Sequence, residues 1–130
     1  MVIFSKEKSF LANWIQKVEE LKTIRIVRIK GDLNAIAVAM LEKLGARARQ
    51  QKGYEHKHLL LDFKDVVSMD SSAVAALLKA LAEHKKTHQK LAIVNLKDSP
   101  WHMMRLAKVS HLFPSYANEE QAIKDLETRF

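Results

Sequence analysis

The residues best suited to chemistry in this sequence are Asp70, Ser71 and Ser72. They follow a run of apolar and β-branched residues and precede an alanine-rich segment, which places them at a predicted strand-to-helix junction. A helix begins with backbone N–H groups that have no intrahelical partner, and its dipole favours negative charge there. A phosphate on Ser71 would add about −1.5 to −2 charges at that point, beside the carboxylate of Asp70. The alternatives are that Asp70 or Ser71 only caps the helix, or that the junction binds a nucleotide or another free anion.

Most other catalytic arrangements are excluded by the residues themselves. The three glycines, Gly31, Gly45 and Gly53, permit neither a GxGxxG nor a GxxxxGK[ST] phosphate loop. Ser71 lacks the G-x-S-x-G elbow of hydrolases. The chain has no cysteine, which excludes disulfides, thiolate metal sites and a cysteine nucleophile. The sequence therefore contains none of these catalytic patterns.

Two histidines have a spacing that could bind a metal ion. His84 and His88 lie four residues apart on a predicted helix, but the run HKKTH lacks the glutamate of the HExxH pattern and contains Lys85 and Lys86. A solvated polar face is the favoured interpretation of such a run. We expect no metal and no other cofactor.

The composition indicates one globular domain that spans residues 1–130. Of these residues 48% are hydrophobic and 28% are charged, and the net charge is +7. A basic surface attracts anions, but only 7% of the residues are aromatic, so specific nucleic-acid binding is not expected. An anionic membrane surface stays open as a partner. The basic residues that could form a patch are Arg47, Arg49, Lys52, Lys57, Lys85, Lys86, Lys90, Arg105 and Lys108.

The chain shows neither a signal peptide nor an apolar run of the roughly 18 residues that a membrane span needs. The expected location is the cytoplasm.

Hydrophobic periodicity predicts the elements that position the Asp70 junction. Apolar residues from Phe10 to Leu21, among them Trp14 and Val18, recur at three- and four-residue steps, which predicts an opening amphipathic helix within residues 1–23. Strands are predicted over residues 23–30, 58–63 and 91–96, and helices over about 34–52, 71–88, 99–108 and 118–126. Strands joined by helices run largely parallel, so we expect an α/β fold with a small, mainly parallel sheet flanked by helices.

Three segments together resemble the STAS family, the sulphate transporter and anti-sigma factor antagonist domains. They are Leu59-Leu60-Leu61-Asp62-Phe63, Val67-Ser68-Met69-Asp70-Ser71-Ser72-Ala73 and the Gly31-Asp32-Leu33 turn. The resemblance covers about residues 24–126, and the Asp-Ser-Ser element before a helix is its most specific part. The family commonly has glycine where this chain has Ala73.

The resemblance implies a single STAS-like domain that docks proteins and does no catalysis. In antagonist members a partner kinase, often itself an anti-sigma factor, phosphorylates the serine after the motif aspartate, and a phosphatase reverses the reaction. That serine corresponds to Ser71, and the implied partner surface is Asp70, Ser71, Ser72 and Ala73. The alternative function is that of a STAS module in a SulP-type anion transporter, where the same surface docks another domain. The opening helix would pack on its own sheet or on a second copy in a homodimer.

Overall fold

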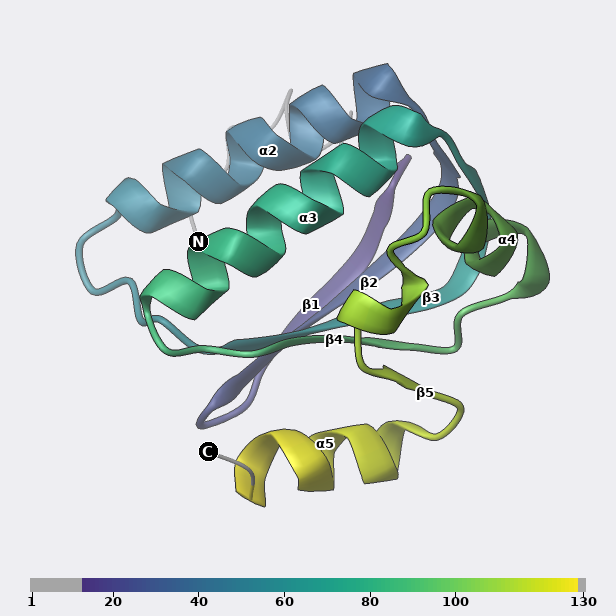
Figure 1. Cartoon of the computed structure of the whole chain (residues 1–130). Helices are drawn as coiled ribbons and strands as arrows, with labels where there is room; N and C mark the ends of the chain where they lie inside the picture. The colour runs from purple at the N-terminus through teal and green to yellow at the C-terminus, as the bar shows by residue number, and fades with distance from the viewer. Residues whose placement is uncertain (1–12, 129–130) are drawn as a thin grey trace.

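The computed structural model describes residues 13–128 and shows an α/β fold (Figure 1). Two strands come first, and helices and strands then alternate. In chain order the elements are β1 (Ile15–Glu20), β2 (Ile24–Leu33), α2 (Ala35–Gln50), β3 (His58–Met69), α3 (Ser71–Lys86), β4 (Leu91–Val94), α4 (Asp98–Leu106), a 3-10 turn (Ser110–Leu112), β5 (Ser115–Tyr116) and α5 (Glu119–Thr128).

The five strands form one sheet in the order β1-β2-β3-β4-β5. The strands from β2 to β5 run parallel to their neighbours, and only β1 runs antiparallel, as the first arm of a hairpin with β2. The expectation of a mainly parallel sheet flanked by helices is confirmed. The parallel order also brings the ends of β2 and β3, and the helices that follow them, to one edge of the sheet, because Leu33 pairs with Met69.

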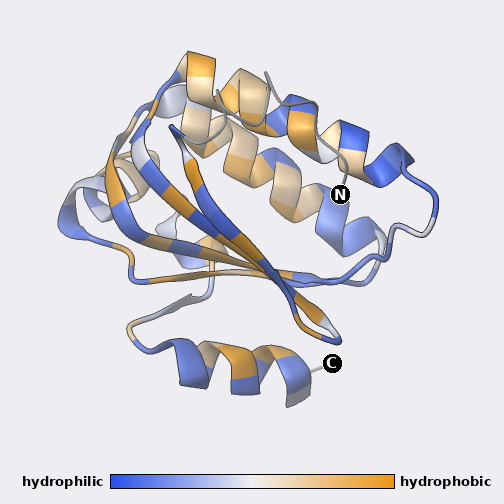
Figure 2. Ribbon diagram, turned by 180° about the vertical axis from the view of Figure 1, so that it is seen from behind, coloured by the Kyte–Doolittle hydropathy of each residue, from blue (hydrophilic) through white to orange (hydrophobic). Residues whose placement is uncertain are grey.

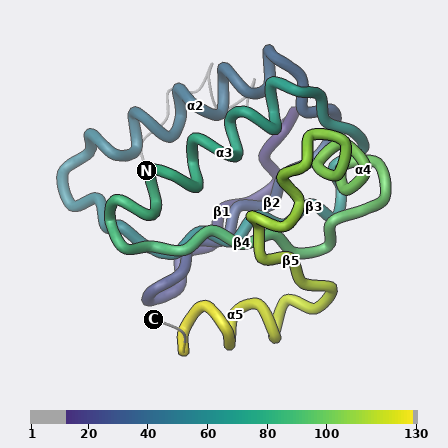
Figure 3. Tube along the Cα trace, viewed as in Figure 1, coloured from purple at the N-terminus to yellow at the C-terminus, as the bar shows by residue number. Residues whose placement is uncertain are grey.

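Both faces of the sheet are covered, as the interior strands require. Helices α2, α3 and α4 lie on one face and α5 on the other (Figures 1 and 3). The larger core, which includes Phe63 and Ile93, lies on the side of α2, α3 and α4, and Ile26 and Leu60 pack against α5 on the other side. Hydrophobic and hydrophilic segments alternate along β1 and β2, as strands exposed to two environments should (Figure 2).

The predicted opening helix is wrong over residues 15–20, which form β1. The reason is a β-bulge. Ile15 pairs with Ile29 and Lys17 with Arg28, so β1 carries one residue more than β2 at this point. The extra residue places Ile15 and Val18 on the same face although they are three apart, which imitates helical spacing. Residues 1–12, where the rest of that prediction falls, lie outside the described residues.

Smaller differences concern one short strand and the ends of other elements, among them β3, which continues to Met69, six residues beyond its predicted end. The strand β5 has only two residues, too few for a hydrophobic pattern. Helix α4 begins at Asp98, one residue before its predicted start, and its N-cap is Lys97. Pro100 is therefore the third helical residue, still within the turn whose N–H groups need no helical partner. Helix α3 ends at Lys86, two residues before the predicted end.

Candidate functional site

The junction between β3 and α3 is held in place by Asp70. Its backbone N–H donates to the carbonyl of Leu33 (3.1 Å), which ties the junction to the end of β2. Its side-chain Oδ1 accepts hydrogen bonds from the N–H of Ser72 (2.9 Å), the N–H of Ala73 (3.2 Å) and the Ser72 hydroxyl. The Ser72 hydroxyl, with the two N–H groups, lowers the pKa of Asp70 below 3.8. Asp70 is therefore the ionised N-cap of α3.

The three residues after Asp70 have different surroundings. Ser71 is the first residue of α3 and is exposed, and within residues 13–128 its hydroxyl has no hydrogen-bond partner. Ser72 is half-buried, and its hydroxyl is engaged by Asp70. Ala73 is only 2% exposed and packs in the core. The structure thus leaves the hydroxyl of Ser71 exposed and without a hydrogen bond, and it removes Ala73 from the surface.

Because Asp70 already accepts from the first-turn N–H groups, these groups are not open to cradle a phosphate on Ser71. A phosphate there would project from the surface beside a carboxylate. The N–H groups of Ser72 and Ala73 are therefore not available to a free anion at this helix start.

Exposed apolar side chains lie at the same edge of the sheet as Ser71. Val67, near the end of β3, is 66% exposed, and Ile36, in the first turn of α2, is 62% exposed. Helix α4, which carries the partly exposed Trp101, lies beside the start of α3 (Figure 1). Contiguous exposed apolar surface is a feature of protein-interaction sites.

The other sequence candidates lie away from Ser71. His84 lies in the last turn of α3 and its Nδ1 is 2.8 Å from the carbonyl oxygen of Ala80, whereas His88 lies beyond the helix with a left-handed φ of 59°. The two are thus not on one helix face, and residues 13–128 contain no cluster of three or more His, Cys, Asp or Glu side chains that could hold a metal. Arg47 and Lys85 lie at the ends of α2 and α3, at the opposite edge of the sheet from Ser71.

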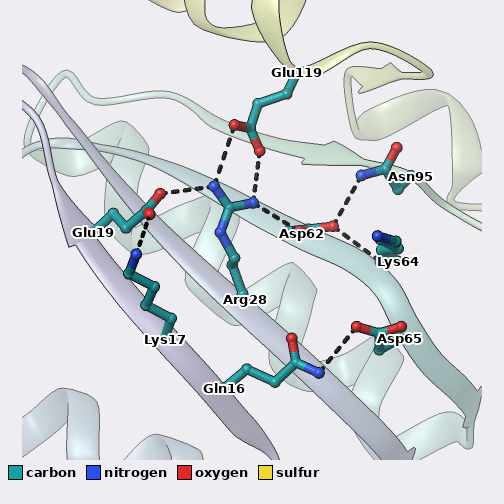
Figure 4. A network of polar contacts seen from close by, with 9 residues as sticks. All are labelled: Gln16, Lys17, Glu19, Arg28, Asp62, Lys64, Asp65, Asn95 and Glu119. Carbon is teal, nitrogen blue, oxygen red and sulfur yellow. Dashed lines mark hydrogen bonds and ion pairs between the residues drawn. The ribbon is translucent and has the colours of Figure 1, made fainter.

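A network around Arg28, on the face covered by α5, was missed by the sequence analysis (Figure 4). The Arg28 guanidinium donates to Asp62 (2.8 Å) on β3, Glu19 (2.7 Å) on β1 and Glu119 (2.7 Å) on α5. Asp62 also accepts from the side chain of Asn95 (3.0 Å). Arg28 on β2 therefore links β1, β3 and α5, and Asp62 extends the network to Asn95 after β4.

The electrostatics of this network favour its charged form. Burial alone raises the pKa of Asp62, but the hydrogen bonds from Asn95, the Lys64 N–H and Arg28 outweigh it, so the pKa lies below 3.8. The hydrogen bond to Glu119 is the largest contribution that raises the pKa of Arg28. The sequence carried one signal for this network, a charged residue at a core-facing position of both β2 and β3. Arg28 lies on the same strand face as Ile24 and Ile26, and Asp62 lies on the same strand face as Leu60.

Replacing Asp70 with alanine is expected to lower the melting temperature by about 4 °C, because α3 loses its N-cap. Asp70→Asn is the matched control, since an amide oxygen caps almost as well as a carboxylate. Thermal unfolding followed by circular dichroism at pH 7 measures both. The lowered pKa of Asp70 means that its charge stabilises the fold above the pKa of the unfolded chain, and that this contribution is lost as the pH falls through the lower pKa of the folded state. An Asp70→Ala variant as stable as Asp70→Asn would contradict the assigned cap.

Comparisons with known proteins agree with one another. The STAS domain family model matches residues 16–122. The fold is similar to TM1081 from Thermotoga maritima (18% identity, TM-score 0.75, 85% of this chain and 93% of that chain). It is also similar to the Bacillus cell fate determinant SpoIIAA in its phosphorylated form (21%, 0.62, 83% and 96%) and to the anti-sigma factor antagonist SpoIIAA in its unphosphorylated form (20%, 0.70, 88% and 97%).

A fourth similar structure is much larger. SLC26A9 is 16% identical with a TM-score of 0.62, and the match covers 84% of this chain but 20% of that chain. No curated protein sequence matches the chain. None of the helices within residues 13–128 is long and apolar enough to cross a membrane.

Proposed function

The chain belongs to the STAS domain family, and we propose that it is a non-enzymatic regulator whose binding to a partner protein is switched by phosphorylation of Ser71. The observation that carries the proposal is the exposed, unengaged hydroxyl of Ser71 at the first position of α3. The cap by Asp70 supports it, because the cap fixes the helix start whether or not Ser71 is modified.

The switch acts through charge and desolvation. With a neutral Ser71, a partner can pack over the start of α3 and the exposed side chains of Val67 and Ile36. A phosphate adds about −2 charge next to the ionised Asp70, and burying both charges in an interface without cationic partners is costly. Phosphorylation therefore releases a partner that binds the neutral form.

The partners we propose are of the antagonist type. They are a serine kinase that is also an anti-sigma factor, and a phosphatase that restores Ser71. Support comes from SpoIIAA, a protein of the same fold that is described as an anti-sigma factor antagonist and has been solved in phosphorylated and unphosphorylated forms. Of the implied contact residues, we retain Asp70, Ser71 and Ser72 and leave out the buried Ala73. We assign the protein to the cytoplasm, where such kinases find ATP.

A second candidate function is that of a docking module in an anion transporter. The observation that favours it is the similar fold within the much larger SLC26A9. In that case the surface around Ser71 binds another domain constitutively, and Ser71 carries no phosphate.

Phosphate transfer to defined variants tests the proposal. Purified wild-type protein, Ser71→Ala and Ser72→Ala are incubated with labelled ATP and an extract of the protein's own cells. We expect label in the wild type and in Ser72→Ala and none in Ser71→Ala, because the Ser72 hydroxyl is already engaged by Asp70. Label that persists in Ser71→Ala at the wild-type level contradicts phosphorylation at Ser71, and no label in any protein favours the docking module.

A further inference from the structure

The edge of the sheet opposite Ser71 carries an excess of positive charge. Between residues 47 and 57 the chain has four basic residues and one acidic residue, Glu55. Between residues 83 and 90 it has three lysines and one acidic residue, Glu83. Both stretches include the end of a helix, α2 or α3, and the loop that follows it, and the two loops leave their helices on the same side of the molecule (Figure 1).

Backbone hydrogen bonds hold the connecting segments of this edge side by side. The N–H of His58 donates to the carbonyl of Thr23 (3.0 Å), which ties the α2–β3 loop to the β1–β2 turn. The N–H of Leu59 donates to the carbonyl of Lys90 (2.8 Å), which ties the start of β3 to the α3–β4 loop. Charged side chains on these three segments therefore belong to one surface.

Five cations of this surface face water, and we call them the basic edge. Their side chains are exposed and make no hydrogen bond or ion pair with the residues between 13 and 128: Lys22, Arg49, Lys52, Lys85 and Lys86. Basic residues near helix C-termini also offset the helix dipoles, but two dipoles amount to only about one negative charge. The basic edge is therefore left with positive charge that the described chain does not compensate.

The chemistry of the basic edge favours a polyanion over a protein as its partner. Protein interfaces bury apolar and aromatic side chains and are depleted of lysine. None of the large exposed apolar side chains in the described chain lies in the three segments of this edge. These side chains are Ile36, Val67, Trp101, Leu106 and Leu112. A partner of the basic edge must therefore be recognised by its charge.

A bilayer with anionic lipids fits the basic edge better than a nucleic acid does. The aromatic ring of the α2–β3 loop, Tyr54, has the Arg25 guanidinium 4.9 Å from its centre and the ring of His56 perpendicular to it, so it offers no open platform for a base. The charges come from three chain segments, not from one helix or hairpin that could enter a groove. Four of the five cations are lysines, which act as point charges and suit diffuse attraction to a charged surface.

We propose that the basic edge binds the surface of a membrane that contains anionic lipids. The bound protein then holds the ends of α2 and α3 at the lipid headgroups. The opposite edge, where Ser71 begins α3, faces away from the membrane and stays accessible. The contact is electrostatic, so it weakens as salt screens the charges. The proposal goes beyond the switch at Ser71 and does not depend on it.

Co-sedimentation of the purified full chain with vesicles tests the proposal. One set of vesicles contains equal parts of phosphatidylcholine and phosphatidylserine, and the other contains phosphatidylcholine alone. The edge variant is Lys52→Gln with Lys85→Gln. The matched control is Lys64→Gln with Lys97→Gln, which removes the same charge from two exposed lysines outside the basic edge. Circular dichroism checks the fold of both variants.

Each lysine near an anionic surface contributes a factor of about five, so we expect the edge variant to bind the phosphatidylserine vesicles about 25-fold more weakly than the wild type. The control variant should bind within about twofold of the wild type, and phosphatidylcholine vesicles should bind neither. Wild-type binding should also fall as salt is added.

Three results would overturn the proposal. They are the absence of wild-type binding to the phosphatidylserine vesicles, binding that salt does not weaken, and an equal loss of binding in both variants. Fluorescence anisotropy with a labelled DNA duplex tests the nucleic-acid alternative. Tighter binding to the duplex than to the vesicles would also overturn the proposal, because the basic edge would then recognise nucleic acid.

Discussion

A negative charge at position 71 is expected to weaken partner binding by about 100-fold, since like charges brought together at an interface cost several kcal/mol. The change is Ser71→Glu, and Ser71→Ala is expected to bind as the neutral wild type does. The probe is the protein that immobilised Ser71→Ala retains from an extract of the protein's own cells. Titration of that purified probe against both variants and the wild type measures the difference.

Ser115→Glu is the matched control for this experiment. Ser115 is also exposed, but it lies on β5, away from the edge of the sheet where Ser71 begins α3. We expect this variant to bind like the wild type. Equal weakening by both glutamates would show a general effect of charge, and equal binding by Ser71→Glu and Ser71→Ala would contradict the switch.

Replacing Arg28 with methionine is expected to lower the free energy of unfolding by about 3 kcal/mol, as removal of one member of a largely buried ionic network usually does. Arg28 is 22% exposed and Asp62 only 7%, and the variant leaves Asp62, Glu19 and Glu119 without their shared cation. Denaturant unfolding at pH 7 measures the loss. The control is Lys17→Met, which removes an exposed partner of Glu19 and should leave the stability close to that of the wild type.

The same variant has a defined pH dependence. The pKa of Asp62 in the folded protein lies below 3.8, so its pairing stabilises the fold fully above the unfolded pKa and less as the pH falls through the folded pKa. The difference between the wild type and Arg28→Met should therefore be largest above about pH 5 and should shrink below about pH 4. A difference that stays constant down to acid pH would show that lost packing, not charge pairing, is responsible.

Much of the fold was predictable because local and tertiary signals agree. The run Leu59-Leu60-Leu61 predicted an interior strand, and β3 is buried there on both faces by helices. Asn34 and Asn118 lie where helices were predicted to begin, and their side chains accept from the N–H groups of Ala37 and Gln121. At such positions the short-range hydrogen bonds that the sequence implies are also those of the folded chain.

The failures came from features that depend on distant residues. The bulge in β1 has no signature of its own, and only the pairing with β2 shows that Ile15 and Val18 share a sheet face. The network of Arg28 joins Glu19 and Glu119, which are 100 residues apart in the chain. Asp70 and Ser71 could be singled out from the sequence, but that Asp70 engages the first-turn N–H groups and leaves the hydroxyl of Ser71 free depends on the folded geometry.

The most direct test of the central claim is to isolate the protein from its own cells and separate partner-bound from free molecules. Intact-mass spectrometry with site mapping of each fraction then locates any phosphate. We predict phosphate on Ser71 in the free fraction and unmodified Ser71 in the partner-bound fraction. Ser71 without phosphate in both fractions under all growth and stress conditions, or phosphate equally present in both, would contradict a switch at this residue.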